Sequence, residues 1–313
     1  MRVTPWAVLT VLLLSIQGLS VQAGAEESDR VLVSFLTTRA VQVAEDGQVR
    51  YSTDVADLSA GRCELALQDD GEFEVLDDGV TALPLDELIN GVPVDSRRLL
   101  IYLHGYNIGL HRACRDAAQL ARRTGFSGDL LLFSWPASQL GVTYRRDEER
   151  LADSLRSILD AIVALSRRYG HDNVSLVAHS MGSRVVLALA EGAGDASLEA
   201  DPLLQNLVLV APDIDRQRFL DVLPRLRAAA EHLYLVVSDG DKLLRLSELV
   251  NQGERLGRSR DLVIEGVQVL DVSDLDDLGP TGHIYHLEND VVGGLIGDVV
   301  APATSPQNAQ SGD

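Results

Sequence analysis

The most informative stretch of the sequence is Val174-Ser175-Leu176-Val177-Ala178-His179-Ser180-Met181-Gly182. Its first five residues are mostly apolar, which is typical of a buried strand, and a helix-like stretch begins at Ser183. A serine between a strand and a helix lies on a tight turn. Ala178 and Gly182 supply the small side chains that this turn needs two residues before and after it. A chance small-Ser-small turn would lack the flanking strand and helix. We therefore predict that Ser180 projects from the carboxyl end of a buried strand.

Further apolar runs of similar length indicate a mostly parallel sheet. From Leu99 onward they alternate with helix-like patterns, as in consecutive βαβ units. Because the runs are largely apolar, we expect helices on both faces of the sheet. Apolar residues at three- and four-residue steps predict the longest helix, from about Tyr144 to Tyr169. The predicted parallel strands are Leu99–Leu103, Leu130–Phe133, Val174–Ala178, Leu207–Val210, Leu233–Val237 and Val267–Leu270.

The segment from residue 31 to 95 has a different pattern. Its short runs are separated by Gly and Asp turns, so we expect antiparallel strands that extend the same sheet at its amino-terminal side. No linker sets this segment apart, and one α/β domain over residues 24–300 accounts for both parts. The tail over residues 301–313 is rich in Pro, Ser, Asn and Gln and is predicted to be disordered. The antiparallel runs are Val31–Thr38, Gln48–Ser52, Arg62–Leu67 and Glu72–Leu76.

A serine hydroxyl is a weak nucleophile at neutral pH, so Ser180 needs a general base. In hydrolases with such a turn the chain order is serine, acid, histidine. Three histidines follow Ser180 in the sequence. His232 begins a predicted strand and His286 lies in the expected last helix, whereas His283 lies in a glycine-containing loop after the last strand. We therefore predict that His283 is the base.

The base needs an orienting carboxylate, and two strand ends offer one. Asp239 and Asp241 follow the penultimate strand, and we choose Asp241, with Asp239 as its alternative. Asp213 and Asp215 follow the preceding strand. Asp213 is the second alternative acid, although both residues there could instead cap the next helix.

The oxyanion that forms during acyl transfer needs two backbone N–H donors fixed in advance. We expect one at Met181 and the other at Tyr106, because Gly105 lets the backbone of that loop approach closely. Asn107 is the rival donor. Asn107 and Trp135 are also the residues that we expect to contact substrate, with simple packing as the alternative for Trp135. Short strand-to-helix connections leave no room for a large cap and predict an open site.

Together these motifs resemble the α/β-hydrolase superfamily, and more narrowly a bacterial lipase/esterase-like branch of undefined function. The resemblance covers about residues 30–298 and implies an α/β-hydrolase fold, a triad of Ser180, Asp241 and His283, and hydrolysis by acyl transfer. The chain departs from the pattern at Ile108-Gly109-Leu110-His111, where an aromatic residue is usual. The motifs are Tyr102–Asn107, Phe133–Pro136, Ala178–Gly182, Ala211–Asp215, Ser238–Asp241 and Gly282-His283.

The amino-terminal residues indicate export. Residues 1–23 have one positive charge, about fourteen mostly apolar residues and a small-residue cleavage site, which together are typical of a signal peptide. The apolar run is shorter than the roughly twenty residues of a membrane span, so an uncleaved anchor is the weaker alternative. We expect a periplasmic or extracellular protein with no stable membrane span. Cys63 and Cys114 could form a disulfide there, but we favour two buried free thiols.

Composition narrows the partners. The chain has 47 acidic and 27 basic residues and a net charge of -20, which excludes a nucleic-acid surface. The two cysteines lack metal-site spacing, and we expect neither a metal nor a cofactor. No basic amphipathic helix is evident, so lasting membrane-surface binding is not expected. The expected partner is a small-molecule or lipid ester.

These observations predict an exported serine hydrolase that cleaves carboxylic ester, thioester or lipid acyl bonds through an acyl-enzyme. Two alternatives remain. One is a binding or envelope-assembly module with a hydrolase-like fold and no turnover, and the other is an amidase or peptidase of the same fold. Neither the substrate nor the oligomeric state follows from the sequence.

Overall fold

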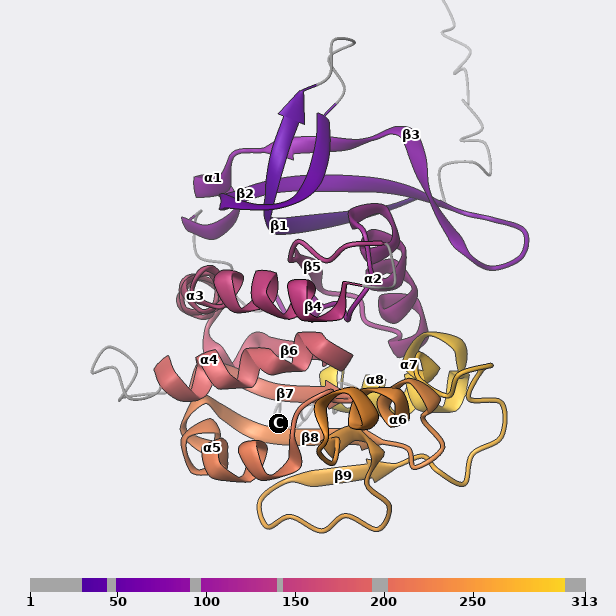
Figure 1. The fold of residues 1–313 in the computed structure, drawn as a ribbon. Coiled ribbons are helices and arrows are strands. Elements are labelled where there is room, and N and C mark those ends of the chain that lie inside the picture. Colours follow the sequence, from indigo (N-terminus) through magenta and orange to yellow (C-terminus); the bar gives the residue numbers. More distant parts are fainter. Residues whose placement is uncertain (1–29, 44–48, 91–96, 140–142, 193–201, 302–313) are drawn as a thin grey trace, which may run out of the picture.

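The computed structural model describes residues 30–43, 49–90, 97–139, 143–192 and 202–301. The predicted signal peptide lies outside these ranges, and so does the predicted tail except for Ala301. A nine-stranded sheet organises the described residues (Figure 1). Its strands are β1 (Arg30–Val43), β2 (Val49–Leu67), β3 (Phe73–Leu83), β4 (Leu99–Leu103), β5 (Asp129–Ser134), β6 (Val174–His179), β7 (Leu204–Val210), β8 (Ala230–Val237) and β9 (Gln268–Asp271).

The sheet is mostly parallel, as predicted. The strand order is β3-β2-β1-β5-β4-β6-β7-β8-β9. All neighbouring pairs from β1 to β9 in this order are parallel, whereas β2 pairs antiparallel with both β1 and β3. In Figure 1 the antiparallel extension lies at the top, in indigo, and β9 lies at the bottom. Every residue of the central strand β4 is buried, which explains its unbroken apolar sequence.

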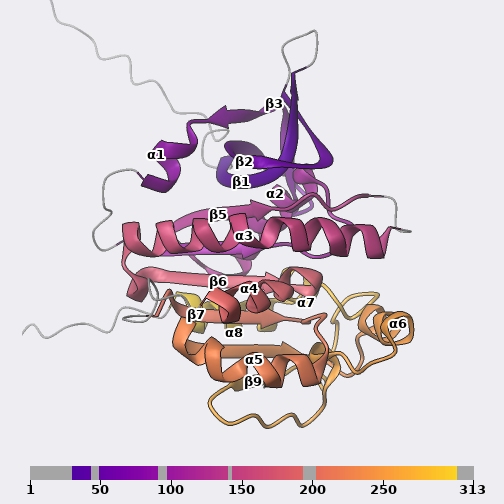
Figure 2. The same ribbon diagram turned by 60° about the vertical axis from the view of Figure 1, so that its left-hand side comes forward.

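Helices cover both faces of the sheet (Figure 2). The helices α3 (Tyr144–Tyr169), α4 (Val185–Gly192) and α5 (Arg216–Ala229) pack into one apolar core, and α3 has the predicted bounds. The helices α2 (Leu110–Thr124), α7 (Tyr285–Glu288) and α8 (Asp290–Val300) pack into the core on the other face. The remaining α-helices are α1 (Leu85–Asn90) and α6 (Lys242–Asn251). Among the helices described, none is both long enough and apolar enough to cross a membrane.

The amino-terminal extension has fewer and longer strands than predicted. The predicted run Gln48–Ser52, from Val49 onward, and the run Arg62–Leu67 belong to one strand, β2, which is paired with β1 along most of its length, whereas Gln48 lies outside the described residues. The register of β1 against β2 shifts between Thr37 and Val41. Irregularities of this kind increase the local twist and let a strand with interrupted apolar patterning stay paired.

The expectation of two free thiols is wrong. Cys63 on β2 and Cys114 on α2 form a disulfide, with their Cα atoms 6.4 Å apart. Both side chains are fully buried in the core that α2 forms with the amino-terminal strands. The sequence shows neither which face of β2 carries Cys63 nor that α2 packs across that face. The bond links the antiparallel extension to α2, the helix between the parallel strands β4 and β5.

Candidate active site

Ser180 lies on the tight turn between β6 and the 3₁₀ helix η3 (Ser180–Arg184). Its φ of 52° is in the left-handed region, which side chains rarely adopt and which is typical of this strained kind of turn. A side chain at Gly182 would collide with the carbonyl oxygen of His104, so the turn can sit against the end of β4 only because this residue is glycine. The predicted need for small residues beside the serine is therefore met.

Three side chains that the sequence singles out meet at the carboxyl edge of the sheet. Nε2 of His283 lies 3.0 Å from Oγ of Ser180, and Nδ1 of His283 lies 2.6 Å from Oδ2 of Asp241. Ser180 follows β6, Asp241 follows β8, and His283 comes from the loop between β9 and α7. Because β6 and β8 run parallel, their ends reach the same edge of the sheet, and the last loop crosses over it.

The partners of Asp241 decide which ring nitrogen of His283 carries the proton. Oδ1 of Asp241 accepts hydrogen bonds from the backbone N–H groups of Leu243 and Leu244, each at 2.9 Å, and so caps α6. The positive end of this helix favours an ionised carboxylate. An ionised carboxylate only accepts, so Nδ1 of His283 donates to it. Nε2 of the neutral ring is then free to accept the proton of Ser180.

Two further histidines lie behind His283. Nε2 of His179 donates to the carbonyl oxygen of His283 at 3.2 Å, and the ring of His179 lies between those of His283 and His286. Nε2 of His286 lies 3.3 Å from the hydroxyl of Tyr102. Burial lowers the pKa of His179, which the neighbouring His286 lowers further, and burial lowers the pKa of His286 to about 3. Both rings therefore stay neutral and support His283 without adding charge.

The three side chains that meet at Ser180 are largely buried. Ser180 is 4% exposed, His283 6% and Asp241 1%. At these values the hydrogen bonds of the three side chains are shielded from water, and a low local dielectric strengthens them.

Asp213, the alternative acid after β7, is occupied elsewhere. Its Oδ2 accepts a hydrogen bond from the hydroxyl of Tyr144 and its Oδ1 accepts one from Ser247, each at 2.6 Å. Arg184 and Arg255 lie at 3.9 and 3.8 Å from the same carboxylate. Burial and the nearby Asp213 raise the pKa of Tyr144 to about 12, so this hydroxyl stays a donor. These contacts hold Asp213 away from the imidazole of His283.

Asp239, the other alternative acid, faces solvent. Its carboxylate forms an ion pair with Arg260 at 2.9 Å, and its side chain is 37% exposed. The neighbouring Asp241 is turned inward instead. Asp215 accepts from the backbone N–H of Arg218 and caps α5, in agreement with the helix-cap interpretation.

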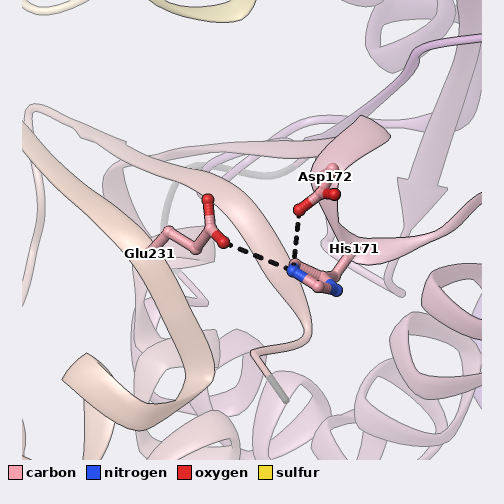
Figure 3. A group of neighbouring side chains, drawn as sticks. All are labelled: His171, Asp172 and Glu231. Atoms are coloured by element: carbon pink, nitrogen blue, oxygen red, sulfur yellow. Dashed lines mark hydrogen bonds and ion pairs between the residues drawn. The ribbon is translucent and has the colours of Figure 1, made fainter.

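A group of potential metal ligands lies at the opposite edge of the sheet (Figure 3). Nε2 of His171 is 2.7 Å from Asp172 and 3.3 Å from Glu231. His171 and Asp172 precede β6, and Glu231 lies near the start of β8, so the group sits at the amino ends of these strands. Both carboxylates are exposed, and the group belongs to the surface away from Ser180.

The loop after β4 lies beside the serine, where the sequence analysis expects the oxyanion donors. A side chain at Gly105 would come within 3.0 Å of Cβ of Ser180, so this backbone is in close contact with it. Tyr106 follows and packs edge-on against Tyr144, with ring centroids 5.4 Å apart. Asn107 is half-buried, with a left-handed φ of 61°. The other predicted donor, Met181, is buried directly after Ser180. The donor roles of Tyr106 and Met181 and the substrate role of Asn107 stay predictions.

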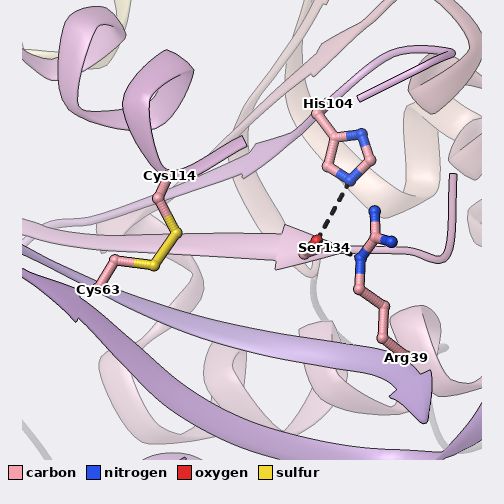
Figure 4. The surroundings of a disulfide bond; sticks show 5 residues. All are labelled: Arg39, Cys63, His104, Cys114 and Ser134. Carbon is pink, nitrogen blue, oxygen red and sulfur yellow. Dashed lines mark hydrogen bonds between the residues drawn. A yellow bond between two sulfur atoms is a disulfide. The ribbon is translucent and has the colours of Figure 1, made fainter. Parts of the chain in front are cut away.

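Arg39 holds this loop in place, and the sequence analysis missed it (Figure 4). The guanidinium comes from β1, is almost fully buried, and donates to the carbonyl oxygens of Ile108 and Ala137 at 2.9 and 3.1 Å. It also donates to Oγ of Ser134, which lies 3.5 Å from Nε2 of His104. Burial lowers the pKa of Arg39 to about 10, and burial together with Arg39 lowers the pKa of His104 to about 3. One sequence signal was available: a charged residue directly after the apolar run of β1.

Trp135, a predicted substrate contact, is packed inside the protein. Its side chain is fully buried, its Nε1 donates to the carbonyl oxygen of His104 at 2.9 Å, and its ring stacks on that of His104. The packing alternative for Trp135 is therefore the one that the structure shows. The aromatic ring fixes the base of the loop that carries Tyr106.

Comparison with curated proteins gave no match. Solved structures with a similar fold include a hyperthermophilic esterase from the archaeon Pyrobaculum calidifontis, with 11% identity over 84% of each chain and a TM-score of 0.39. A structure from a study of two fungal esterases from Rhizomucor miehei shares 12% identity with this chain, over 88% of this chain and 87% of that one, with a TM-score of 0.39. The esterase LipW from Mycobacterium marinum shares 14% identity with this chain, over 87% of this chain and 81% of that one, with a TM-score of 0.37. These likenesses are too distant to bear on activity.

The sequence itself identifies the family. Residues 86–298 match the family described as alpha/beta hydrolase of unknown function (DUF900), and this range covers most of the chain and all three residues that meet at Ser180. The chain belongs to this family of α/β hydrolases.

Proposed function

We propose that the protein is an exported serine hydrolase that cleaves carboxylic esters through an acyl-enzyme on Ser180. The observation that carries this proposal is the unbroken hydrogen-bonded chain from Asp241 through His283 to the hydroxyl of Ser180. Such a chain supplies the nucleophile, its base and the carboxylate that orients the base.

In the first half of the proposed reaction, Oγ of Ser180 attacks the ester carbonyl while Nε2 of His283 takes the hydroxyl proton. The imidazolium that forms is stabilised by Asp241, which already holds Nδ1. The carbonyl oxygen becomes an oxyanion, for which the backbone N–H groups of Met181 and Tyr106 are the proposed donors. Collapse of this intermediate passes the proton from Nε2 to the leaving alcohol and leaves the acyl group on Ser180.

The second half repeats these steps with water. His283 takes a proton from the water that attacks the acyl carbonyl, and returns it to Oγ of Ser180 as the carboxylic acid leaves. Because the rings of His179 and His286 stay neutral, they add no positive charge near His283 in either half of the reaction.

The test combines covalent labelling with turnover. A fluorophosphonate probe should label Ser180 in the folded protein, and p-nitrophenyl esters should be hydrolysed. Ser180→Ala should abolish labelling and lower kcat by at least about 10⁴-fold. Ser127→Ala, an exposed serine just before β5 at the amino edge of the sheet, is the matched control and should keep both properties. Absence of both labelling and turnover in folded wild-type protein would overturn the proposal and favour a non-catalytic module. Faster hydrolysis of p-nitroanilides than of esters would assign an amidase.

Export is a separate part of the proposal. The buried disulfide between Cys63 and Cys114 supports it, because disulfides persist mainly in oxidising compartments. The mature protein recovered from outside the cytoplasm should begin near Gly24, as the small-residue site predicts. Amino-terminal sequencing checks this, and a fully cytoplasmic chain that retains Met1 would contradict it.

A further inference from the structure

The helix α6 carries a stripe of apolar side chains that faces solvent. Leu243 is 44% exposed, Leu246 58%, Leu249 73% and Val250 44%. Steps of three and four residues bring these side chains onto one side of the helix. An exposed apolar surface of this kind on one element marks an interaction site more often than chance. We call these four residues the α6 stripe.

The opposite side of α6 is packed on the protein. Leu244 is buried, and Ser247 donates to Asp213. The helix is therefore amphipathic with its apolar stripe outward, the reverse of a helix that only covers a core. No basic amphipathic helix is predicted from the sequence, and the short segment 242–251 is not among the predicted helices.

The α6 stripe adjoins the candidate active site. Asp241 caps the first turn of α6 and also binds His283, and the backbone N–H of Lys242 donates to the carbonyl oxygen of Thr281 in the loop that carries His283. In Figure 2, α6 stands at the right-hand edge of the molecule. A surface that covers the stripe therefore lies next to the elements that hold Asp241 and His283.

The charges beside the stripe fit phosphate groups. Lys242 and Arg245 flank it, and in the described part of the chain no carboxylate pairs with Arg245. Among the residues that the structure describes, Nζ of Lys242 donates only to the carbonyl oxygen of Pro280. The acidic residue of the helix, Glu248, turns away from the stripe and pairs with Arg258 at 2.7 Å. In a chain with a net charge of -20, an apolar stripe flanked by Lys242 and Arg245 is a local exception.

A second copy of the chain fits this surface less well than a lipid. Stable protein interfaces involve roughly 20–30 residues on each side, far more than the four side chains of the stripe. A lipid surface needs only a few apolar side chains on a preformed helix, with cations at the level of the headgroups.

We propose that α6 docks the protein on a phospholipid surface, and that the ester cleaved at Ser180 is an acyl lipid taken from that surface. The second part rests on the proposed function, whereas the docking itself does not. Leu246 and Leu249, the most exposed members of the stripe, insert between the acyl chains, and Lys242 and Arg245 contact the phosphates.

Flotation with vesicles of equal parts phosphatidylcholine and phosphatidylglycerol tests the docking in a Ser180→Ala background, where no turnover is needed. Leu246→Ser with Leu249→Ser should lower the partition coefficient about 100-fold, roughly tenfold for each side chain. Arg245→Gln should lower it about fivefold. Val263→Ser with Val291→Ser is the matched control, because these residues are 92% and 56% exposed but lie outside α6, and it should float like the parent. Circular dichroism and thermal unfolding check that each variant folds.

Three results would overturn the docking proposal. The parent could fail to float, the leucine variant could float equally well, or sedimentation velocity could show a dimer that only the leucine variant loses, which would assign the stripe to a second copy.

In the Ser180-intact protein, the rate on a long-chain ester in vesicles relative to a short soluble ester should fall at least about tenfold in the leucine variant. An unchanged ratio would overturn the lipid substrate. Soluble-ester turnover without flotation would leave the proposed function standing, and flotation without any turnover would remove that function but not the docking.

Discussion

The ends of β7 and β8 both present a buried carboxylate near Ser180, yet the two regions are built differently. Asp213 after β7 is held by two hydroxyl groups and two arginines, whereas Asp241 after β8 is held by the amino end of α6 and by His283. Position after a parallel strand is therefore not enough to assign the acid of a triad. The partners of the carboxylate decide it.

The two regions should also respond differently to protons. Arginine side chains such as those beside Asp213 stay charged through the pH range in which histidines ordinarily titrate. The region of Asp241 is backed by neutral histidines instead, whose charge would change as the pH falls. We therefore expect proton transfer in the region of Asp241 and a fixed structural role for Asp213.

The largest expected effect is on turnover. Asp241→Asn should lower kcat about 10⁴-fold. An amide at this position does not hold the proton on Nδ1 of His283, and it therefore stabilises the wrong tautomer of the ring. Asp213→Asn should lower kcat less than about tenfold. Steady-state kinetics on a soluble ester measure both. The reverse ranking would move the acid to the end of β7.

The next effect is on stability. Asp213→Ala should lower the free energy of unfolding by about 3–5 kcal/mol, because it leaves buried Arg255 without its carboxylate and removes one of the two carboxylates beside Arg184, which keeps Glu148. Urea unfolding measures the change. Asp215→Ala is the control and should cost about 1 kcal/mol, as expected for loss of a helix cap. Equal losses in the two variants would show that the Asp213 cluster is not a structural centre.

A smaller effect should appear on acidification. Burial lowers the folded-state pKa of His286 to about 3, from 6.5 in the unfolded chain. Between these values the unfolded chain binds more protons, so the free energy of unfolding falls as the pH drops below 6.5, by about 2 kcal/mol at about pH 5 for this residue. His179 and His104 add to the loss in the same direction. Urea unfolding at both pH values tests this, and His286→Phe should flatten the dependence. A variant with the parent's slope would contradict it.

The smallest effect concerns a single hydroxyl. Tyr144→Phe removes one donor to Asp213 while Ser247 and both arginines remain. We expect a loss of about 1 kcal/mol in the free energy of unfolding and little change in kcat. Thermal unfolding with parallel kinetics measures both. A larger fall in kcat than in stability would tie the Asp213 region to the chemistry after all.

The sequence predicted those features of the molecule that depend on local order along the chain. Strand, serine and helix are consecutive, so Ser180 and the parallel sheet could be predicted, and His283 follows from its place after the last strand. The disulfide, Arg39 and Trp135 depend on contacts across the sheet. Tertiary packing, rather than local pattern, decides which face of β2 meets α2. It also decides that β1 pairs with β5 and brings a guanidinium beneath the loop after β4.

The exposed stripe of α6 was missed for a related reason. A segment of ten residues with leucines on two sides fits a buried element as well as a surface one, and periodicity alone does not separate them. Only the packing of Leu244 and Ser247 against the protein shows which side is outward.

The most direct test of the central claim is to trap the acyl-enzyme. Wild-type protein is mixed with a p-nitrophenyl ester, quenched in acid during turnover, and digested for mass spectrometry. We predict one acyl group on the peptide that contains Ser180 in the wild-type protein and none in Ser180→Ala. In Asp241→Asn the acylated fraction should be larger, relative to the turnover rate, than in the wild-type protein. Ester turnover by Ser180→Ala at the wild-type rate, or an acyl group on any other residue, would contradict it.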